Sequence, residues 1–230
     1  MRETARDRRA VVKNGLVLGS LLAIPGAVSA AQKLTSRDLK PLSQPPLPGR
    51  ASVPAQPLIS SRVVRPELLK RALASLDRHG ARTKRDRMAI VDFSAASSQP
   101  RFHFVDLASG RSTSLLVSHG SGSDPAHTGH LQRFSNAFGS NASSEGAFLT
   151  SDYYHGKHGK SQRLIGLDPT NNNALGRAIV IHAAWYANKD ILKTRGVLGR
   201  SQGCFAVGER ELEQVFARLG EGRMIYATKV

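Results

Sequence analysis

Residues 177–182 read Arg-Ala-Ile-Val-Ile-His, and the apolar core of this run predicts a buried strand that ends at His182. Residues 201–204 read Ser-Gln-Gly-Cys, and Gly203 predicts a turn just before a helix-like stretch. Cys204 follows His182 by 22 positions in the chain. A fold that pairs the two stretches would bring a thiol and an imidazole into one groove.

Cys204 is the single cysteine of the 230-residue chain, so it cannot form an internal disulfide. It is therefore buried and inert, paired with another molecule, or a free reactive thiol. A thiol at its reference pKa of about 8.5 is mostly protonated at pH 7, and an imidazole beside it can take the proton. Backbone N–H groups at a turn made by Gly203 could stabilise an oxyanion. Cysteine plus histidine alone is a weak signal, because many proteins contain both.

The residues around these two stretches predict a mainly β (α+β) domain with one or two helices. From residue 88 onward, short runs of β-forming residues alternate with turns rich in Gly, Asn and Ser. After Pro66, leucines recur at spacings of three and four, which predicts a helix ending near Gly80. The expected strands are 88–93, 101–107, 113–118, 147–151, 162–167, 177–182 and 224–228, and the second expected helix is 209–219.

The N-terminal region predicts export to the periplasm or cell envelope. A paired Arg8-Arg9 precedes a short apolar stretch, 16–24, and a small-residue run, 27–31, as in a secretory signal of the twin-arginine type. The apolar stretch is far shorter than the ~20 residues that span a bilayer, so we expect no integral membrane span after signal removal. The expected divisions are 1–31 for the signal peptide, 32–61 for a proline-rich linker, 62–87 for a helix and basic connector, and 88–230 for the main domain.

The formal charge of +16 is concentrated ahead of the β domain. Residues 31–90 hold 13 Lys and Arg against 4 Asp and Glu. Such an arm can bind an anionic polymer. Nucleic acid is disfavoured as a partner, because no aromatic platform or binding motif accompanies the basic residues. An acidic wall or membrane surface fits an exported chain better, and the oligomeric state is unknown from sequence.

From about residue 88 to 228 the chain resembles the murein L,D-transpeptidase catalytic-domain family, in its branch with an extended histidine-to-cysteine loop. This resemblance rests on seven segments that match the family, of which the last two are its defining ones. The matching segments are Ile90–Ser94, Ser118–Gly120, Phe134–Asn136, Tyr154–Ser161, Leu164–Leu167, Arg177–His182 and Leu198–Cys204.

The resemblance implies a β-sandwich that uses no metal and no other cofactor. It implies a thiolate attack by Cys204 on a peptidoglycan stem tetrapeptide, with D-alanine as leaving group and an amine or water as acceptor. His182 would be the general base, then acid, and the carbonyl of Ala183 would orient its ring. The N–H groups of Gly203 and Cys204 would form part of the oxyanion hole.

The sequence departs from the family pattern at three positions, and these put the acceptor and the pocket shape in doubt. Gln202 stands where Trp, His or Arg is common, Phe205 where Pro or Ile is usual, and Ala183 where Gly is usual. Six residues are expected to contact substrate: Ser201, Gln202, His119, Tyr154, Lys157 and His158.

Other histidines and aromatic residues have competing interpretations. For His119, a turn histidine that makes a backbone hydrogen bond is about as good an explanation as a substrate contact. The pairs His127/His130 and His155/His158 suggest a zinc-dependent murein peptidase or amidase, but they lie in Gly/Ser-rich loops without an accompanying acid motif. A non-catalytic wall-binding relative is the other rival. For Trp185 and Tyr186, which follow His182 closely, core packing is the default expectation.

Overall fold

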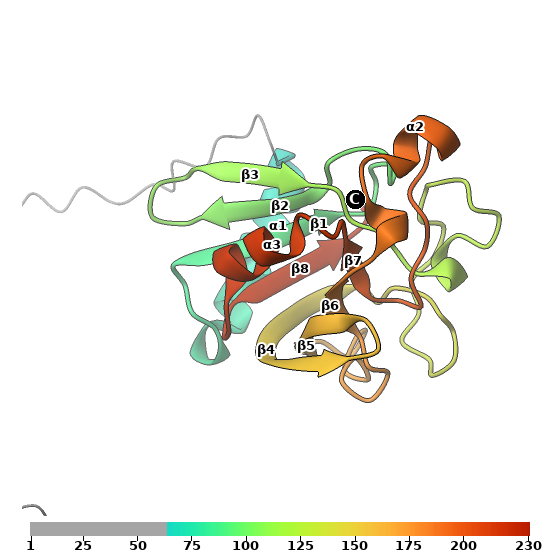
Figure 1. Cartoon of the computed structure of the whole chain (residues 1–230). Coiled ribbons are helices and arrows are strands. Elements are labelled where there is room, and N and C mark those ends of the chain that lie inside the picture. Colours follow the sequence, from blue (N-terminus) through green and yellow to red (C-terminus); the bar gives the residue numbers. More distant parts are fainter. Residues whose placement is uncertain (1–63) are drawn as a thin grey trace, which may run out of the picture. The chain divides into compact units, whose positions relative to one another are not determined.

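The structure is a computed structural model that describes residues 64–230, so the predicted signal peptide and proline-rich linker lie outside the described residues. The prediction of a mainly β domain with few helices is confirmed (Figure 1). The helices are α1 (Pro66–Arg78), α2 (Ile191–Arg195) and α3 (Leu212–Leu219), with short 3-10 turns η1 (Gly80–Arg82), η2 (Ser121–Ser123) and η3 (Trp185–Ala187). The strands are β1 (Arg87–Asp92), β2 (Phe102–Asp106), β3 (Ser112–Leu115), β4 (Gly146–Gly156), β5 (Gly159–Gly166), β6 (Val180–Ala183), β7 (Phe205–Val207) and β8 (Met224–Thr228).

These strands form one eight-stranded sheet in the order β3-β2-β1-β8-β4-β5-β6-β7. Two neighbouring pairs are parallel, β1 with β8 and β6 with β7, and the other pairs are antiparallel. The long strand β4 carries a register shift between Thr150 and Tyr153, and such a bulge bends a strand and increases its twist. The curvature of β4 and β5 is visible in Figure 1.

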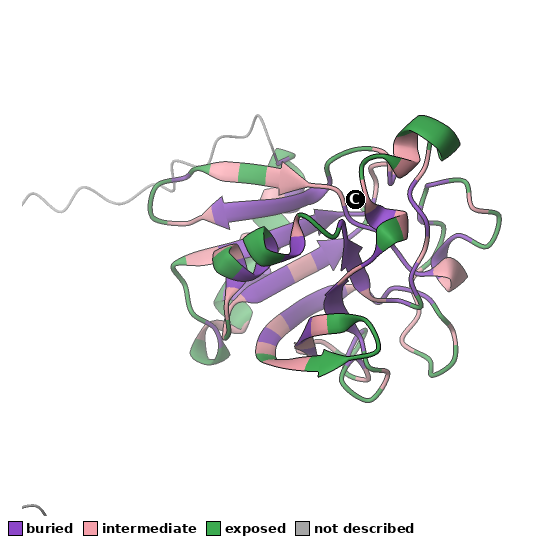
Figure 2. Ribbon diagram, viewed as in Figure 1, coloured by how far each residue is buried: buried purple, intermediate pink, exposed green. Residues whose placement is uncertain are grey.

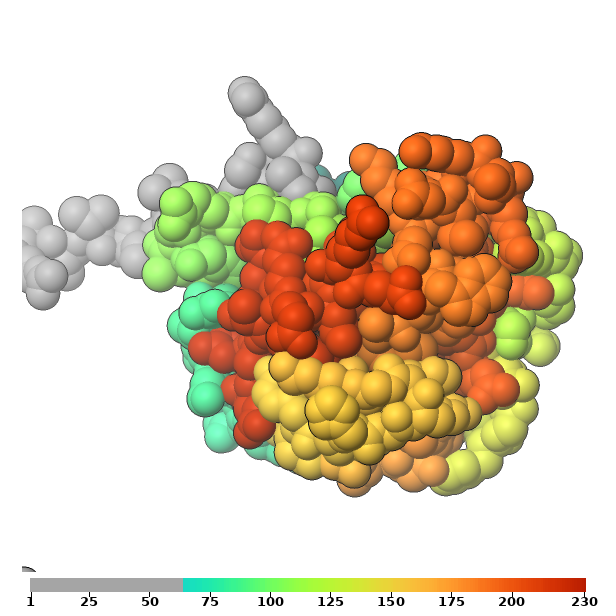
Figure 3. Space-filling view, in the orientation of Figure 1, coloured from blue at the N-terminus to red at the C-terminus, as the bar shows by residue number. Residues whose placement is uncertain are grey.

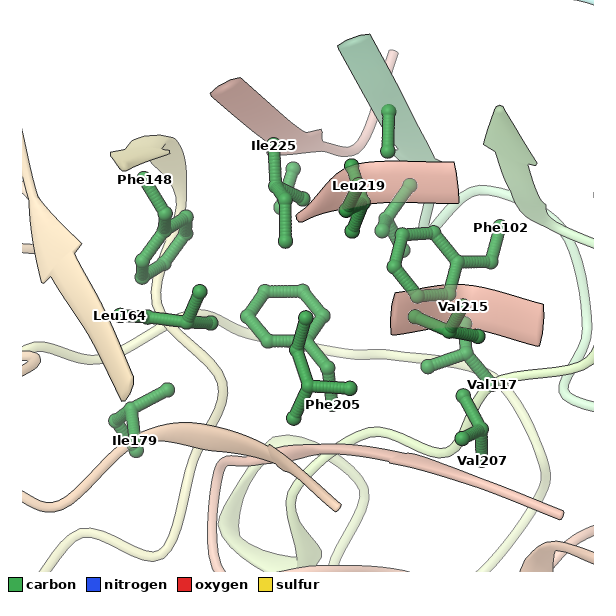
Figure 4. Packing of buried hydrophobic residues seen from close by; sticks show 14 of the residues in the cluster. Phe102, Val117, Phe148, Leu164, Ile179, Phe205, Val207, Val215, Leu219 and Ile225 are labelled. Atoms are coloured by element: carbon green, nitrogen blue, oxygen red, sulfur yellow. The ribbon is translucent and has the colours of Figure 1, made fainter. Parts of the chain in front are cut away.

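The two ends of the bent sheet face each other across the main hydrophobic core (Figure 4). Phe205 on β7 is 1% exposed, and its ring centroid lies 6.3 Å from that of Phe102 on β2 and 5.2 Å from that of Phe148 on β4. Just past β3, the Ser118 N–H donates to the Ala206 carbonyl at 2.9 Å. A single curled sheet therefore makes both layers of the expected sandwich.

Helices α1 and α3 cover opposite faces of the sheet. The apolar side of α3, with Val215 and Leu219 fully buried, packs into the main core. The apolar side of α1, with Leu68 and Leu76, packs on the other face against Met88. Burying each such leucine stabilises the fold by about 1.5–3 kcal/mol. The outward sides of both helices are exposed (Figure 2).

The start of α1 is also tied to the sheet by a polar contact. Proline at the first helical position needs no N–H partner, which favours a helix start at Pro66. The Arg65 guanidinium makes a two-pronged bond to the Asp92 carboxylate at the end of β1, with the Nη2–Oδ1 distance 2.8 Å. The predicted helix after Pro66 is therefore confirmed, and it is joined to the β domain.

Several expected boundaries differ from those in the structure. Strand β6 begins at Val180 rather than at residue 177, because Ala178 has φ +54° and cannot continue an extended strand. Strand β3 ends at Leu115 rather than 118. The short elements β7 and α2 were not predicted. Within residues 64–230, no helix is both long and apolar enough to cross a bilayer.

Candidate active site

Strands β6 and β7 bring Cys204 and His182 to the same pocket. The parallel register pairs Ile181 with Phe205, so Cys204, immediately before β7, lies level with Val180. His182 lies two positions after Val180, and side chains two positions apart on a strand point to the same face. His182 and Cys204 therefore face the same side of the sheet. Both line a pocket of about 320 Å³. The sheet thus places close together two residues that are 22 positions apart in the chain.

The His182 imidazole is held in one orientation. Its side chain is almost fully buried, and Nδ1 donates to the Ala183 carbonyl oxygen at 2.8 Å. Since a carbonyl only accepts, the proton of the neutral ring is on Nδ1 and the basic lone pair is on Nε2. Burial lowers the pKa of His182 to about 4, assisted by the neighbouring His158 and Lys157 and opposed by the Ala183 carbonyl. The ring is therefore neutral at pH 7 and able to accept a proton.

The Cys204 thiol is half-buried, and burial raises its pKa. A hydrogen bond with the Val180 backbone and the charges of Lys157 and Arg177 act in the opposite direction. The Sγ atom lies 3.5 Å from the Ala178 carbonyl oxygen, within the range of a weak S–H donor. In the resting protein a neutral thiol therefore lies in the same pocket as a neutral imidazole.

The turn that carries Cys204 is fixed by Ser201 and Gly203. The Ser201 hydroxyl donates to the Cys204 carbonyl at 2.7 Å and accepts from the Gly203 N–H at 3.1 Å. In the resting structure this N–H is therefore bonded within the turn, and its expected role toward an oxyanion stays a prediction. Gly203 also has a conformational role: its φ is +109°, and a Cβ atom there would lie 2.6 Å from the Ala142 carbonyl oxygen.

The remaining pocket walls come from the β4–β5 hairpin and from loops beside β6 and β7. Of the residues expected to contact substrate, Tyr154, Lys157, His158, Ser201 and Gln202 line the pocket. The Ser201 side chain is buried in the turn, whereas Gln202 is exposed. Figure 3 shows the hairpin (yellow) on the surface beside the orange segment that follows β6.

Five further lining residues were not predicted, and three of them have polar side chains: Arg177, Arg200 and Tyr186; the other two are Ala178 and Val180. The two arginines stand inside the stretches that contain His182 and Cys204, so their position in the sequence was the available signal. Arg177 also ties down the loop before β4, since it donates to the Ser135 carbonyl at 2.8 Å and the Ala142 carbonyl at 2.6 Å. Arg177, Arg200 and Lys157 are three cations around the pocket, and its lining contains no Asp or Glu from the described residues 64–230. The pocket thus favours an anionic ligand.

His119 is not among the lining residues, and its ring bonds to side chains rather than to the backbone, so neither of its two expected arrangements is observed. Its side chain is almost fully buried. The Arg101 guanidinium donates to Nδ1 at 2.7 Å, and Nε2 lies 3.4 Å from the Asp124 carboxylate. Burial and the charge of Arg101 lower the pKa of His119 to about 4. The residue is part of a buried polar cluster behind the site.

Two aromatic residues after His182 also differ from the expected core packing. Trp185 is 56% exposed. Tyr186 is half-buried and forms part of the pocket wall. The core position in this region is taken by Phe205, which explains a large apolar side chain at the position after Cys204.

The two histidine pairs considered for zinc are dispersed. The Nε2 atom of His127 donates to the Leu198 carbonyl at 2.8 Å, and the ring of His158 stacks on that of His182. Among residues 64–230, no group of three or more His, Cys, Asp or Glu side chains is arranged to hold a metal ion.

Comparisons with known proteins found one matching family model and several similar solved structures. The family model described as "L,D-transpeptidase catalytic domain" matches residues 60–228. No curated protein matches the sequence. Among solved structures, an L,D-transpeptidase from Mycobacterium smegmatis is similar at 11% identity and TM-score 0.38, over 62% of this chain and 58% of that one. Another from Mycobacterium tuberculosis H37Rv is similar at 12% identity and TM-score 0.39, over 62% and 57%. The match therefore spans less than two thirds of each solved chain.

Proposed function

From the premise that this chain belongs to the L,D-transpeptidase catalytic-domain family, we propose that it is a cysteine acyltransferase of peptidoglycan stem peptides. The observation that carries the proposal is the pairing of β6 with β7, which places Cys204 and His182 in one pocket with Nδ1 of His182 already bonded. A non-catalytic wall-binding relative would have no need of this pair.

The reaction begins from a neutral thiol and a neutral imidazole. As Sγ of Cys204 attacks the carbonyl of the L-centre of diaminopimelate in a tetrapeptide stem, Nε2 of His182 takes the thiol proton. The Ala183 carbonyl stabilises the imidazolium that forms. Collapse of the tetrahedral intermediate breaks the bond to D-alanine, whose amine takes the proton from His182, and a thioester remains.

A second substrate then resolves the thioester. An amine of another stem, or water, attacks the carbonyl while His182 accepts a proton from it, and the Cys204 sulfur leaves and is reprotonated. Because the Gly203 N–H is engaged by Ser201, the Cys204 N–H is the turn amide that we assign to the oxyanion. Transfer, hydrolysis to give an L,D-carboxypeptidase activity, and anchoring of a protein to the wall share these steps and differ only in the acceptor.

The charge of the pocket supports a stem peptide as substrate. Stem peptides carry free carboxylates, and Lys157, Arg177 and Arg200 line the pocket without an acidic neighbour among the lining residues. Tyr154 and Gln202 supply further polar contacts. Export of the chain to the periplasm or cell envelope, by the predicted signal at residues 1–31, would place the enzyme at this polymer.

The proposal is tested with defined tetrapeptide muropeptides and mass spectrometry of the products. We expect the protein to release D-alanine, Cys204→Ala to abolish release, and His182→Ala to reduce it by about 10²-fold or more. A thiol-reactive probe should label Cys204, and should do so more slowly in His182→Ala. Ser94→Ala, remote from the pocket, is the control. Release of D-alanine by Cys204→Ala would refute the mechanism, and unchanged release after chelation would argue against a zinc enzyme.

A further inference from the structure

A second histidine covers the face of the His182 ring. The ring centroids of His158 and His182 lie 4.2 Å apart, and the two planes are inclined by only 20°. His158 is an exposed residue of the hairpin, whereas His182 is 1% exposed. The His158 ring is therefore part of what separates the His182 ring from water.

The position of His158 is set by a braced hairpin. His158 lies between β4 and β5, and the register continues to Gly156 and Gly159 at the tip. Next to the tip, the Lys160 ammonium is 3.0 Å from the Glu213 carboxylate of α3 and lies over the Phe216 ring at 5.3 Å. Arg163 of β5 stacks over the Tyr154 ring of β4 at 4.1 Å. These contacts keep the hairpin against the domain, so the stacking does not depend on a free loop.

The two contacts of His182 restrain different motions of its ring. The bond from Nδ1 to the Ala183 carbonyl fixes one edge of the ring but leaves rotation about that bond. A second ring lying flat on it fixes the plane. With both contacts in place, the lone pair of Nε2 points in one fixed direction, as a general base requires.

We propose that His158 is a positioning residue for His182, which holds the plane of the imidazole and excludes water from its outer face. The inference rests on the proposed function of His182 as the base for Cys204. It differs from the expectation that His158 contacts substrate, because the packed face of its ring is turned to His182 rather than to the pocket contents.

The charges around this ring pair show why a neutral stacking partner is needed. Lys157 on the hairpin, Arg177 before β6 and Arg200 before the Cys204 turn are cations, and Tyr154, Tyr186 and Cys204 are the other titratable neighbours. Within the part of the chain that the structure describes, no carboxylate lines the pocket, so a proton on His158 would add a cation against His182 without compensation. Burial and Lys157 lower the pKa of His158, which keeps it neutral near pH 7.

Two substitutions separate positioning from substrate contact. His158→Phe keeps a flat ring that can stack but cannot hydrogen-bond or take a proton, and His158→Ala removes the ring. His155→Ala is the matched control, since His155 is an exposed histidine on the same hairpin. The measurements are the rate of Cys204 alkylation by iodoacetamide from about pH 4 to about pH 9, and kcat and KM for D-alanine release from a tetrapeptide muropeptide.

We expect His158→Ala to lower two rates by about tenfold each: the rate of Cys204 alkylation at neutral pH, and kcat for D-alanine release. Tenfold is equivalent to about 1.4 kcal/mol in the barrier, and KM should stay within about twofold of the parent value. His158→Phe should restore most of both rates. The acid limb of the alkylation profile should move to higher pH in both variants, because the charge that His158 acquires in acid lowers the pKa of His182 and is lost in both. In the Ala variant the His182 ring also gains water. His155→Ala should match the parent protein.

The proposal is overturned if His158→Phe is as impaired as His158→Ala while its melting temperature is unchanged, or if KM rises in both variants at constant kcat, as a substrate contact requires. Alkylation reports only on the thiol and imidazole. A parent protein that releases no D-alanine but shows the expected alkylation series would therefore refute the proposed substrate and leave the positioning role standing.

Discussion

The sharpest test of the site's construction is Gly203→Ala, one residue before the nucleophile. The backbone at Gly203 has φ +109°, a region that residues with a Cβ rarely adopt. A Cβ atom would lie 2.6 Å from the Ala142 carbonyl oxygen and 2.8 Å from Cδ1 of Ile179. The closer of these contacts is with backbone, so no side-chain rotation can relieve it.

The cost has two parts. Holding a non-glycine residue at this φ costs about 1–3 kcal/mol, and overpacking against a fixed neighbour costs about 1–3 kcal/mol more. A loss of about 3 kcal/mol in the free energy of unfolding lowers the melting temperature by about 6–12 °C in a domain of this size. Any relief must move the Gly203 N–H away from Ser201, and Cys204 moves with it. We expect Cys204 labelling and D-alanine release to fall at least tenfold.

Gly196→Ala is the matched control. Gly196 follows α2 with φ +71°, and a Cβ there meets nothing within 4 Å. This variant should therefore lose only about 1 kcal/mol in the free energy of unfolding, or about 2–4 °C in melting temperature, with Cys204 labelling unchanged. Melting is followed by calorimetry and labelling by mass spectrometry. Equal melting temperatures for the two variants, or unimpaired labelling in Gly203→Ala, would refute this account of the turn.

Two further predictions concern charge. His119 and His182 have pKa values of about 4 in the folded protein against about 6.5 when unfolded, so the unfolded chain binds more protons below pH 6.5. The free energy of unfolding should thus be highest above about pH 6.5 and fall progressively towards about pH 4, by up to about 3 kcal/mol per histidine. Urea unfolding that is independent of pH over this range would contradict the prediction. Lys157→Gln should raise the pKa of the Cys204 thiol and shift its labelling profile to higher pH, because the Lys157 charge lowers that pKa. Lys193→Gln, at an exposed lysine of α2 that pairs with Asp190, is the control, and an equal shift in both would count against a local effect of Lys157.

Much of the fold was predictable because local patterns and tertiary packing agree. The leucine spacing after Pro66 predicted α1, whose apolar side is buried as expected. The residues 224–228 predicted β8 with its observed ends. Where the pattern was short the prediction failed: β7 has three residues, Phe205–Val207, too few to show a period. Its parallel pairing with β6 is set by packing of the whole sheet, which no local pattern encodes.

The buried polar cluster behind the site could not be predicted from residue types. Arg101 is fully buried, although arginine is among the residues most often exposed. Its guanidinium is satisfied by the carbonyls of Val117 and Ala95 and by the His119 ring. These partners come from separate loops, so only the assembled fold gives the buried Arg101 guanidinium the hydrogen-bond partners that a buried cation needs. A sequence pattern read locally therefore placed His119 in the groove.

Two of the buried histidines, His119 and His182, show how the partner of one ring nitrogen decides what the other can do. At His119, Nδ1 faces the Arg101 guanidinium, which only donates, so the proton is on Nε2 and points to Asp124. At His182, Nδ1 faces the Ala183 carbonyl, which only accepts, so the proton is on Nδ1 and the Nε2 lone pair is free. Burial lowers the pKa of both rings to about 4, so the pKa does not distinguish them. Only His182 combines a free basic nitrogen with a pocket that a thiol shares. The tautomer set by the Ala183 carbonyl, rather than the presence of a histidine, is therefore what makes this residue fit to act as a base.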